Sequence, residues 1–196
     1  AAGLDLELYG MGAAVGDYDN DGWVDLFISA VGENRLLRNR LGRFVDVSEF
    51  AGVTGGESDW STGSAFFDYD NDGDLDLFVG NYVRWSRQID LEIDFRLTGL
   101  GRAYGAPNHF IGTNSYLYRN DGDGRFTDMS RAAGIVVEDP GSGAPAGKAL
   151  SVGPLDYDRD GRIDLFVAND TVRNFLFHNQ GEGRFEEVGA FEGVSY

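Results

Sequence analysis

The stretch that decides the fold is residues 16–28, which read Gly16-Asp17-Tyr18-Asp19-Asn20-Asp21-Gly22-Trp23-Val24-Asp25-Leu26-Phe27-Ile28. The pattern returns at residues 67–79 as Phe67-Asp68-Tyr69-Asp70-Asn71-Asp72-Gly73-Asp74-Leu75-Asp76-Leu77-Phe78-Val79. It returns again at residues 155–167 as Leu155-Asp156-Tyr157-Asp158-Arg159-Asp160-Gly161-Arg162-Ile163-Asp164-Leu165-Phe166-Val167. Self-similarity of this kind is the signature of a repeat architecture, so the chain is predicted to contain three units of one type.

Further phrases recur in the same order after each copy. They are Leu36-Leu37-Arg38-Asn39, Leu117-Tyr118-Arg119-Asn120 and Leu176-Phe177-His178-Asn179, then a Gly-Arg-Phe turn ending at Phe44, Phe126 and Phe185. Each unit closes on Ala51-Gly52-Val53, Ala133-Gly134-Ile135 or Glu192-Gly193-Val194, and the chain opens with Ala2-Gly3-Leu4 in the same phase. We therefore expect a slice of a longer array. Its parts are the end of a preceding blade and a lead-in (1–11), then repeats at 12–60, 61–147 and 148–196.

Each repeat holds four short segments rich in aliphatic and aromatic residues and bounded by Gly, Asn and Asp, which indicates strands. In the first repeat they cover about residues 13–17, 24–30, 35–38 and 43–47. The predicted fold class is all-β, with β-propeller blades of four antiparallel strands; a β-solenoid has shorter coils. Because propellers typically have about 4 to 8 blades, three need more chain, another domain or another subunit to close a ring.

The second repeat is longer than the others. The aspartate loop of the second repeat begins 51 residues after that of the first repeat. The loop of the third repeat begins 88 residues after that of the second. The excess lies at about residues 82–113, a stretch that includes Arg84, Trp85, Arg87, Tyr104 and His109. Such an insertion either covers a partner or caps the edge of its own blade, and the sequence favours neither.

Composition narrows the function classes. The 196 residues are 42% hydrophobic and carry a formal charge of −17, from 33 acidic against 16 basic residues. A hydrophobic core can therefore form. The negative charge makes nucleic acid and anionic membrane surfaces poor partners, so we expect no nucleic-acid partner. No apolar run is long enough for membrane insertion, and the absence of cysteine removes thiolate chemistry.

The aspartate loops have the donors that calcium prefers, which are about six to eight hard oxygens in a flexible shell. Carboxylates are expected at loop positions 1, 3, 5 and 9, a backbone carbonyl at position 7, and a glycine with positive φ at position 6. The three predicted ligand sets are Asp17, Asp19, Asp21, Trp23 and Asp25; Asp68, Asp70, Asp72, Asp74 and Asp76; and Asp156, Asp158, Asp160, Arg162 and Asp164. Trp23, Asp74 and Arg162 would each bind through the backbone carbonyl.

Other metals and calcium folds fit less well. An EF-hand needs a glutamate at position 12, which here is Ile28, Val79 or Val167. Zinc fits poorly because neither histidine is expected to lie beside a loop, and magnesium resists so complete a protein shell. Acidic surface turns that bind nothing are the remaining alternative, yet four carboxylates within nine residues would repel one another without a counter-ion.

Calcium binding would bear on stability and on location. Three bound ions would change the formal charge from −17 to about −11. At free calcium about 100 times the dissociation constant, each site would stabilise the fold by about 2.7 kcal/mol. Such sites would be largely empty at cytosolic calcium levels, so we expect an extracellular or periplasmic protein.

The chain resembles FG-GAP/VCBS repeat proteins of the ASPIC/UnbV, cartilage acidic protein-like branch. The resemblance rests on the loops, on the lead-ins at residues 9–13 and 60–64, and on the run at residues 167–177. It implies a seven-bladed, integrin-α-like propeller with calcium between the first two strands of a blade, in secreted or surface-exposed proteins of adhesion and assembly. The ASPIC/UnbV domain itself is absent, and Gly105 stands after Tyr104 where many relatives would have a cysteine.

Three functions stay open at this point. The first is a non-catalytic scaffold that contacts a protein or a glycan, with calcium as a structural ion. The second is part of a carbohydrate-active enzyme, although no acid/base pair stands out, and His178 reads as a strand residue in place of Arg38 and Arg119. The third is an accessory subunit of a larger assembly that supplies the surfaces needed to finish the propeller.

Overall fold

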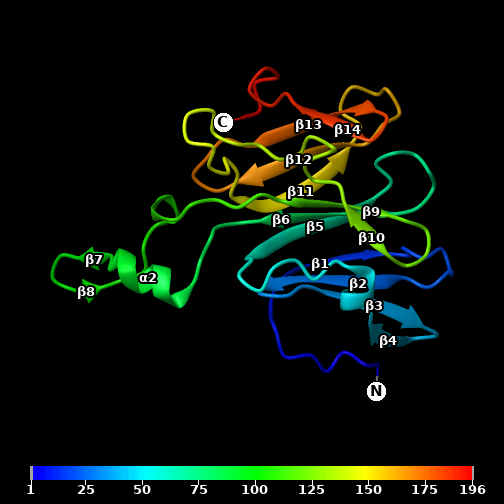
Figure 1. Ribbon diagram of the computed structural model, residues 1–196, viewed down its shortest axis with the longest axis horizontal. Helices are drawn as coiled ribbons and strands as arrows, with labels where there is room; N and C mark the ends of the chain where they lie inside the picture. The colour runs from blue at the N-terminus through cyan, green and yellow to red at the C-terminus, as the bar shows by residue number, and fades with distance from the viewer. Residues whose placement is uncertain (1, 196) are drawn as a thin grey trace.

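The computed structural model describes residues 2–195 and consists mainly of short antiparallel strands (Figure 1). The first sheet holds β1 (Tyr9–Gly16), β2 (Asp25–Val31), β3 (Arg35–Arg40) and β4 (Arg43–Asp46). The second holds β5 (Ser61–Phe67), β6 (Asp76–Asn81), β9 (Tyr116–Asn120) and β10 (Phe126–Asp128), and the third β11 (Ala149–Leu155), β12 (Asp164–Asn169), β13 (Phe175–Gly181) and β14 (Arg184–Glu187). Each sheet is a meander in chain order, so the prediction of four-stranded antiparallel blades is confirmed.

Two details differ from the expected strands. β1 begins at Tyr9 rather than near residue 13, because Tyr9 pairs with Val31 and a bulge between Gly10 and Gly12 keeps the register. Helical segments also occur, namely α1 (Ser48–Ala51), α2 (Arg87–Ile93) and the 3-10 turn η1 (Pro107–His109). In the part of the chain that the structure describes, none of the helices has the length and apolar character needed to cross a membrane.

The three sheets stack face to face, as Figure 1 shows, and a core layer fills each of the two spaces between them. Every residue of β6 is buried because this strand has a sheet on both sides. Its side chains alternate between the layers: Leu77 and Val79 join the core with the first sheet, and Phe78 joins the core with the third. The continuous apolar run of the middle repeat thus follows from its position.

The insertion leaves the second sheet between β6 and β9 and carries α2, η1 and a small hairpin of β7 (Arg96–Leu97) and β8 (Gly101–Arg102). In Figure 1 it projects sideways from the stacked sheets. Its two ends are held together, since the amide of Arg84 donates to the carbonyl oxygen of Ile111 at 2.8 Å. Trp60 and Trp85 pack edge to face at its root, with ring centroids 5.8 Å apart.

The closing phrase of one repeat binds the last strand of the next sheet. The amide of Phe185 in β14 donates to the carbonyl oxygen of Ala133 at 2.7 Å. A Cβ on Gly134 would lie 2.6 Å from the carbonyl oxygen of Phe185, and the φ of Gly134 is +84°, so only glycine fits there. The opening residues treat the first sheet in the same way, with Phe44 donating to Ala2 at 2.8 Å.

A buried asparagine ties each later sheet to the loop of the sheet before it. Asn120 in β9 donates through Nδ2 to the carbonyl oxygen of Tyr18 at 2.7 Å, and also to a carbonyl of its own sheet. Asn179 in β13 repeats this with the carbonyl of Tyr69 at 2.8 Å. These side chains hold adjacent sheets in register through polar contacts inside an apolar interface.

We expect Asn120→Ala and Asn179→Ala each to lower the free energy of unfolding by about 1–3 kcal/mol, because each leaves buried carbonyl groups without a donor. Asn39→Ala is the matched control, since Asn39 donates only within its own sheet, to Val24 at 2.9 Å. Urea unfolding at fixed calcium measures the three costs. Equal losses for all three variants would contradict a role in joining the sheets.

Candidate metal centres

The three aspartate loops occupy equivalent places, each joining the first two strands of its sheet. In every loop the first aspartate turns the backbone around its own carboxylate. Asp17 accepts the amides of Asp21 at 3.0 Å and Gly22 at 2.8 Å. Asp68 and Asp156 accept the amides of the corresponding two residues in their loops at 3.0–3.2 Å. The loop backbone therefore closes on this aspartate before any ion is considered.

The last aspartate of each loop is buried and joins the loop to the third strand of its sheet. Asp76 accepts the amide of Tyr69 at 3.0 Å and the amide of Asn120 at 2.8 Å. Asp25 and Asp164 make the same pair of bonds in their sheets, at 2.7–3.2 Å. The exposed fraction of all three residues is at most 1%. Position 9 is thus a structural element of the blade as well as a predicted ligand.

Glycine at loop position 6 has positive φ in all three loops, as predicted, with Gly22 at 87°, Gly73 at 94° and Gly161 at 87°. Position 4 is also left-handed, which the sequence analysis did not foresee. Asn20 and Asn71 suit this conformation, whereas Arg159, at φ 64°, adopts it against its preference.

The structure brings together three of the four predicted carboxylates in each loop. Oxygen atoms from positions 1, 3 and 9 lie within 4.8 Å of one another; the groups are Asp17, Asp19 and Asp25; Asp68, Asp70 and Asp76; and Asp156, Asp158 and Asp164. The position 5 aspartates Asp21, Asp72 and Asp160 lie outside these groups, and each accepts the amide of position 7 at 2.9–3.0 Å. Ligation by position 5 and by the carbonyls of Trp23, Asp74 and Arg162 stays a prediction.

The position 3 aspartates have the character of cation ligands. Oδ1 of Asp19 and Oδ1 of Asp70 are buried without a hydrogen-bond donor, whereas Oδ2 of Asp19 lies beside the guanidinium of Arg38. Burial, opposed by Arg38, raises the pKa of Asp19; burial and the neighbouring Asp72 and Asp68 raise the pKa of Asp70. Buried carboxylate oxygens that lack a partner are costly, and an oxygen-loving cation between positions 1, 3 and 9 would relieve that cost. The residues present therefore fit such an ion.

The third strand brings a side chain to an aspartate of the first and third loops, and the sequence analysis missed this. Arg38 Nε lies 2.5 Å from Asp19 in the first loop, whereas Arg119 pairs with Asp121 at 3.0 Å in the second. In the third loop His178 Nε2 lies 3.6 Å from Asp158. The expectation that neither histidine lies beside a loop is therefore wrong for His178. The antiparallel pairing of strands two and three carries this residue back to the loop, and its varying identity at one repeat position was the available signal.

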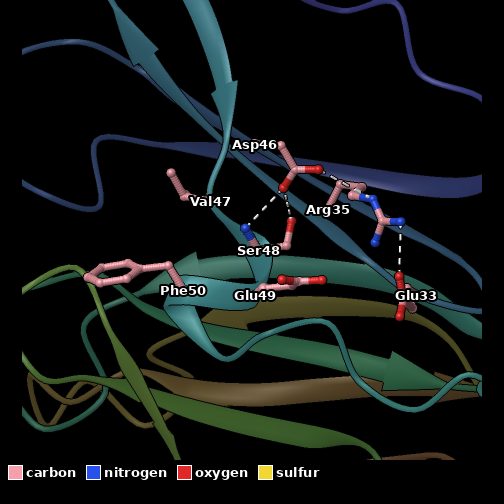
Figure 2. Close-up of a pocket in the computed structure, with 7 residues that line it drawn as sticks. All are labelled: Glu33, Arg35, Asp46, Val47, Ser48, Glu49 and Phe50. Carbon is pink, nitrogen blue, oxygen red and sulfur yellow. Dashed lines mark hydrogen bonds and ion pairs between the residues drawn. The ribbon is translucent and has the colours of Figure 1, made fainter.

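The hollow between residues 33 and 50 follows from blade geometry rather than from a binding site. Figure 2 shows Arg35 between Glu33 and Asp46, with the backbone and hydroxyl of Ser48 bonded to Asp46. Its volume is about 380 Å³, and a hollow of about 370 Å³ recurs in the second sheet around Asp128 and Ser130, the equivalent residues.

An aromatic pocket of about 260 Å³ lies at the root of the insertion, the segment that lengthens the second repeat. Trp60, Tyr82, Trp85, Tyr104 and Phe110 contribute to its lining. Tyr104 is 92% exposed. The other four rings are half-buried. Tyrosine and tryptophan side chains, which combine an apolar ring with a polar end, are enriched at recognition surfaces.

Comparison with known proteins gives matches along the repeats. A family model described as FG-GAP-like repeat matches residues 8–79 and 156–195, which is more than half of the chain. Cartilage acidic protein 1 of mouse is 26% identical over 198 residues, covering 94% of this chain and 26% of its own length. The human protein of the same name is 32% identical over 101 residues, covering 46% of this chain and 15% of its own length. The chain thus spans about a quarter or less of these relatives.

The buried carboxyls predict an inverted pH dependence in the absence of divalent ions. Burial raises the pKa of Asp25 to about 6 and that of Asp76 to about 7, above the value of about 4 in an unfolded chain. Between the unfolded and folded pKa values, the folded protein binds more protons than the unfolded chain. The raised pKa values therefore contribute stability that is fully present below about pH 4 and is lost as the pH rises to about 7. In chelator we expect the unfolding free energy to fall by at least about 1 kcal/mol from pH 5 to 7.5.

Excess calcium should remove or reverse this slope, because it binds the deprotonated carboxylates. Thermal and urea unfolding across pH 5–7.5, with and without calcium, measures both slopes. Asp139→Asn, at an exposed turn, is the control and should leave them unchanged. A steady rise of stability with pH in chelator would contradict the assignment.

Proposed function

Since this chain belongs to the FG-GAP-like repeat family, we propose that it is a calcium-stabilised, non-catalytic β-propeller module for protein or glycan contact in adhesion or assembly. The single observation that carries the calcium part is the grouping of positions 1, 3 and 9 in all three loops, with ligand atoms within 4.8 Å. Carboxylate oxygens without nitrogen or sulfur donors favour calcium over transition metals in the first two loops.

The proposed role of calcium is structural. Each loop joins two strands of its sheet, and its last aspartate reaches the third strand through the amide of Asn39, Asn120 or Asn179. An ion shared by positions 1, 3 and 9 would therefore hold three strands together. A structural site of this kind would be saturated at the millimolar calcium concentrations found outside cells. This is the basis for proposing an extracellular or periplasmic protein.

A non-catalytic role agrees with where the most perturbed carboxyls lie. Asp25 and Asp76 are fully buried, and each is engaged by two backbone amides. A general acid or base has to reach substrate within hydrogen-bond distance, and these groups are covered. Their raised pKa values belong to the metal loops, so the carbohydrate-active alternative gains no support from them.

The outer sheets offer surfaces for completing an array. β1 presents Tyr9, Met11 and Val15 with exposed fractions of 81%, 47% and 67%, and β11 presents Leu150 and Leu155 at 48% and 39%. The equivalent faces of the inner strands are buried between sheets. We take these rows as the places where further blades, of the same chain or of another subunit, would pack.

Calcium should raise the melting temperature of the chain by at least about 5 °C relative to chelator. One site at 100-fold saturation contributes about 2.7 kcal/mol, and 1 kcal/mol corresponds to about 2–4 °C at this size. Asp19→Ala, Asp70→Ala and Asp158→Ala should each reduce the shift, whereas Glu57→Gln, at an exposed turn, should not. Asp70→Ala should reduce it more than Asp19→Ala, because Arg38 already neutralises Asp19.

Magnesium should give a smaller shift than calcium, since its strict octahedral geometry does not suit a protein shell of this kind. Isothermal titration with calcium gives the number of sites. Identical melts in calcium and chelator, with no metal in the purified protein, would sink the calcium assignment and the extracellular inference with it.

The insertion is the surface we propose for the partner, because its aromatic pocket is particular to the second repeat. Tyr104→Ala should abolish binding of the protein or glycan partner and leave the calcium-dependent shift in melting temperature unchanged. Retention of a defined glycan on an array in calcium, lost in Tyr104→Ala, assigns a glycan partner. Tyr104-dependent binding of a defined protein without glycan retention assigns a protein. Binding that is indifferent to Tyr104→Ala contradicts a role for this pocket.

A further inference from the structure

The third loop has a nitrogen donor that the other two lack. Ligand atoms of His178, Asp158 and Asp160 lie within 4.8 Å of one another, on the side of the loop that faces β13. The residues at the same position of the other sheets are Arg38 and Arg119, whose guanidinium groups cannot bind a metal ion. The chain therefore has one loop in which an imidazole and two carboxylates converge.

The imidazole is held in the orientation that a metal ligand needs. Its Nδ1 lies 3.1 Å from the hydroxyl of Tyr157, and the two rings meet edge to face with centroids 5.5 Å apart. The side chain of His178 is 18% exposed, so its Nε2 faces Asp158 in a partly covered setting. A second polar partner on the far nitrogen is the usual way in which proteins fix the ring and tautomer of a metal-binding histidine.

The carboxylates bring other contacts that a metal ion would have to accommodate. Asp160 pairs with the guanidinium of Arg162 and accepts the Arg162 amide at 2.9 Å. Arg162 Nε also donates to the carbonyl oxygen of Asn179 at 2.8 Å, which anchors the guanidinium independently of Asp160. Asp158 belongs also to the oxygen group with Asp156 and Asp164, so the two groups share one carboxylate.

The geometry points to a transition-metal site at His178, Asp158 and Asp160, selective for an ion such as Zn²⁺ over Ca²⁺. Imidazole together with carboxylate suits zinc and its neighbours, whereas calcium prefers oxygen donors alone. The required tautomer has the proton on Nδ1, donated to Tyr157, and the lone pair on Nε2 directed at the ion. Because Asp158 is shared, calcium in the loop competes with zinc. The site itself does not depend on calcium occupying the other loops.

The alternative to a metal site is an ion pair between His178 and Asp158. A protonated His178 beside Asp158 would then replace the contact that Arg38 makes with Asp19. The substitution His178→Arg distinguishes the ion pair from the metal site. Arginine would keep a charge pair and would remove a metal ligand.

Zinc titration of the folded chain, at a fixed low calcium concentration and with circular dichroism to confirm folding, tests the proposal. We expect one zinc site per chain that His178→Gln and His178→Arg each weaken at least about 10-fold. Tyr157→Phe should weaken it about 10-fold, as removal of an outer partner typically does. Both substitutions at 178 should fold, since the other two repeats carry arginine at that position.

His109→Gln is the matched control, because the chain has 2 histidines and no cysteine. Co²⁺ in place of Zn²⁺ gives a second measurement, since its visible spectrum should report a nitrogen ligand that His178→Gln removes and His109→Gln retains. Calcium titration of the same variants should be nearly unchanged, which separates this site from the calcium proposal. Equal zinc affinity in folded wild type, His178→Gln and His178→Arg would overturn the site, and so would loss of zinc binding in His109→Gln.

Discussion

The structure depends on one buried carboxylate in each sheet. Asp25, Asp76 and Asp164 each accept one amide from their own loop and one from the third strand. Without this pair of bonds the loop would have no fixed position over the sheet, and the carboxylates at positions 1 and 3 would have no reason to meet. The same burial raises the pKa of Asp25 and Asp76, so the element that organises the blade also creates a demand for positive charge.

The asparagine that supplies the third-strand amide also connects neighbouring sheets. Asn120 and Asn179 use their backbone to hold the aspartate of their own sheet and their side chain to hold the loop of the sheet before. The first and second loops are thus each attached to two sheets. A change in one loop should be felt by its neighbour through a single residue, in the manner of nearest-neighbour coupling in repeat proteins.

Much of this arrangement could be predicted from the sequence, because it is local and repeated. The recurrence of Asp17 to Asp25 fixed the strand pairs, the loop and the glycine with positive φ. What the sequence did not provide depends on side chains that meet across strands. The approach of His178 to Asp158 follows from antiparallel register, and the bond from Asn179 to Tyr69 spans 110 positions. The pairing of Arg119 with Asp121 is particular to the second repeat, because Arg40 and Gln180 take the place of Asp121 in the other two.

The contact between Ala133-Gly134 and Phe185 places the sequence repeat and the structural blade out of phase. The first and third blades thus have the edge of their outermost strand bonded by residues that precede the blade in the chain, Phe44 to Ala2 and Phe185 to Ala133. Recombination that exchanges whole blades between proteins of this kind would have to cut just before a closing phrase, near residue 132, rather than at the start of the next first strand. An exchange made at the start of the first strand would separate a closing phrase from the outer strand that it bonds. That strand would lose its partner, and the closing phrase would stay with the wrong blade.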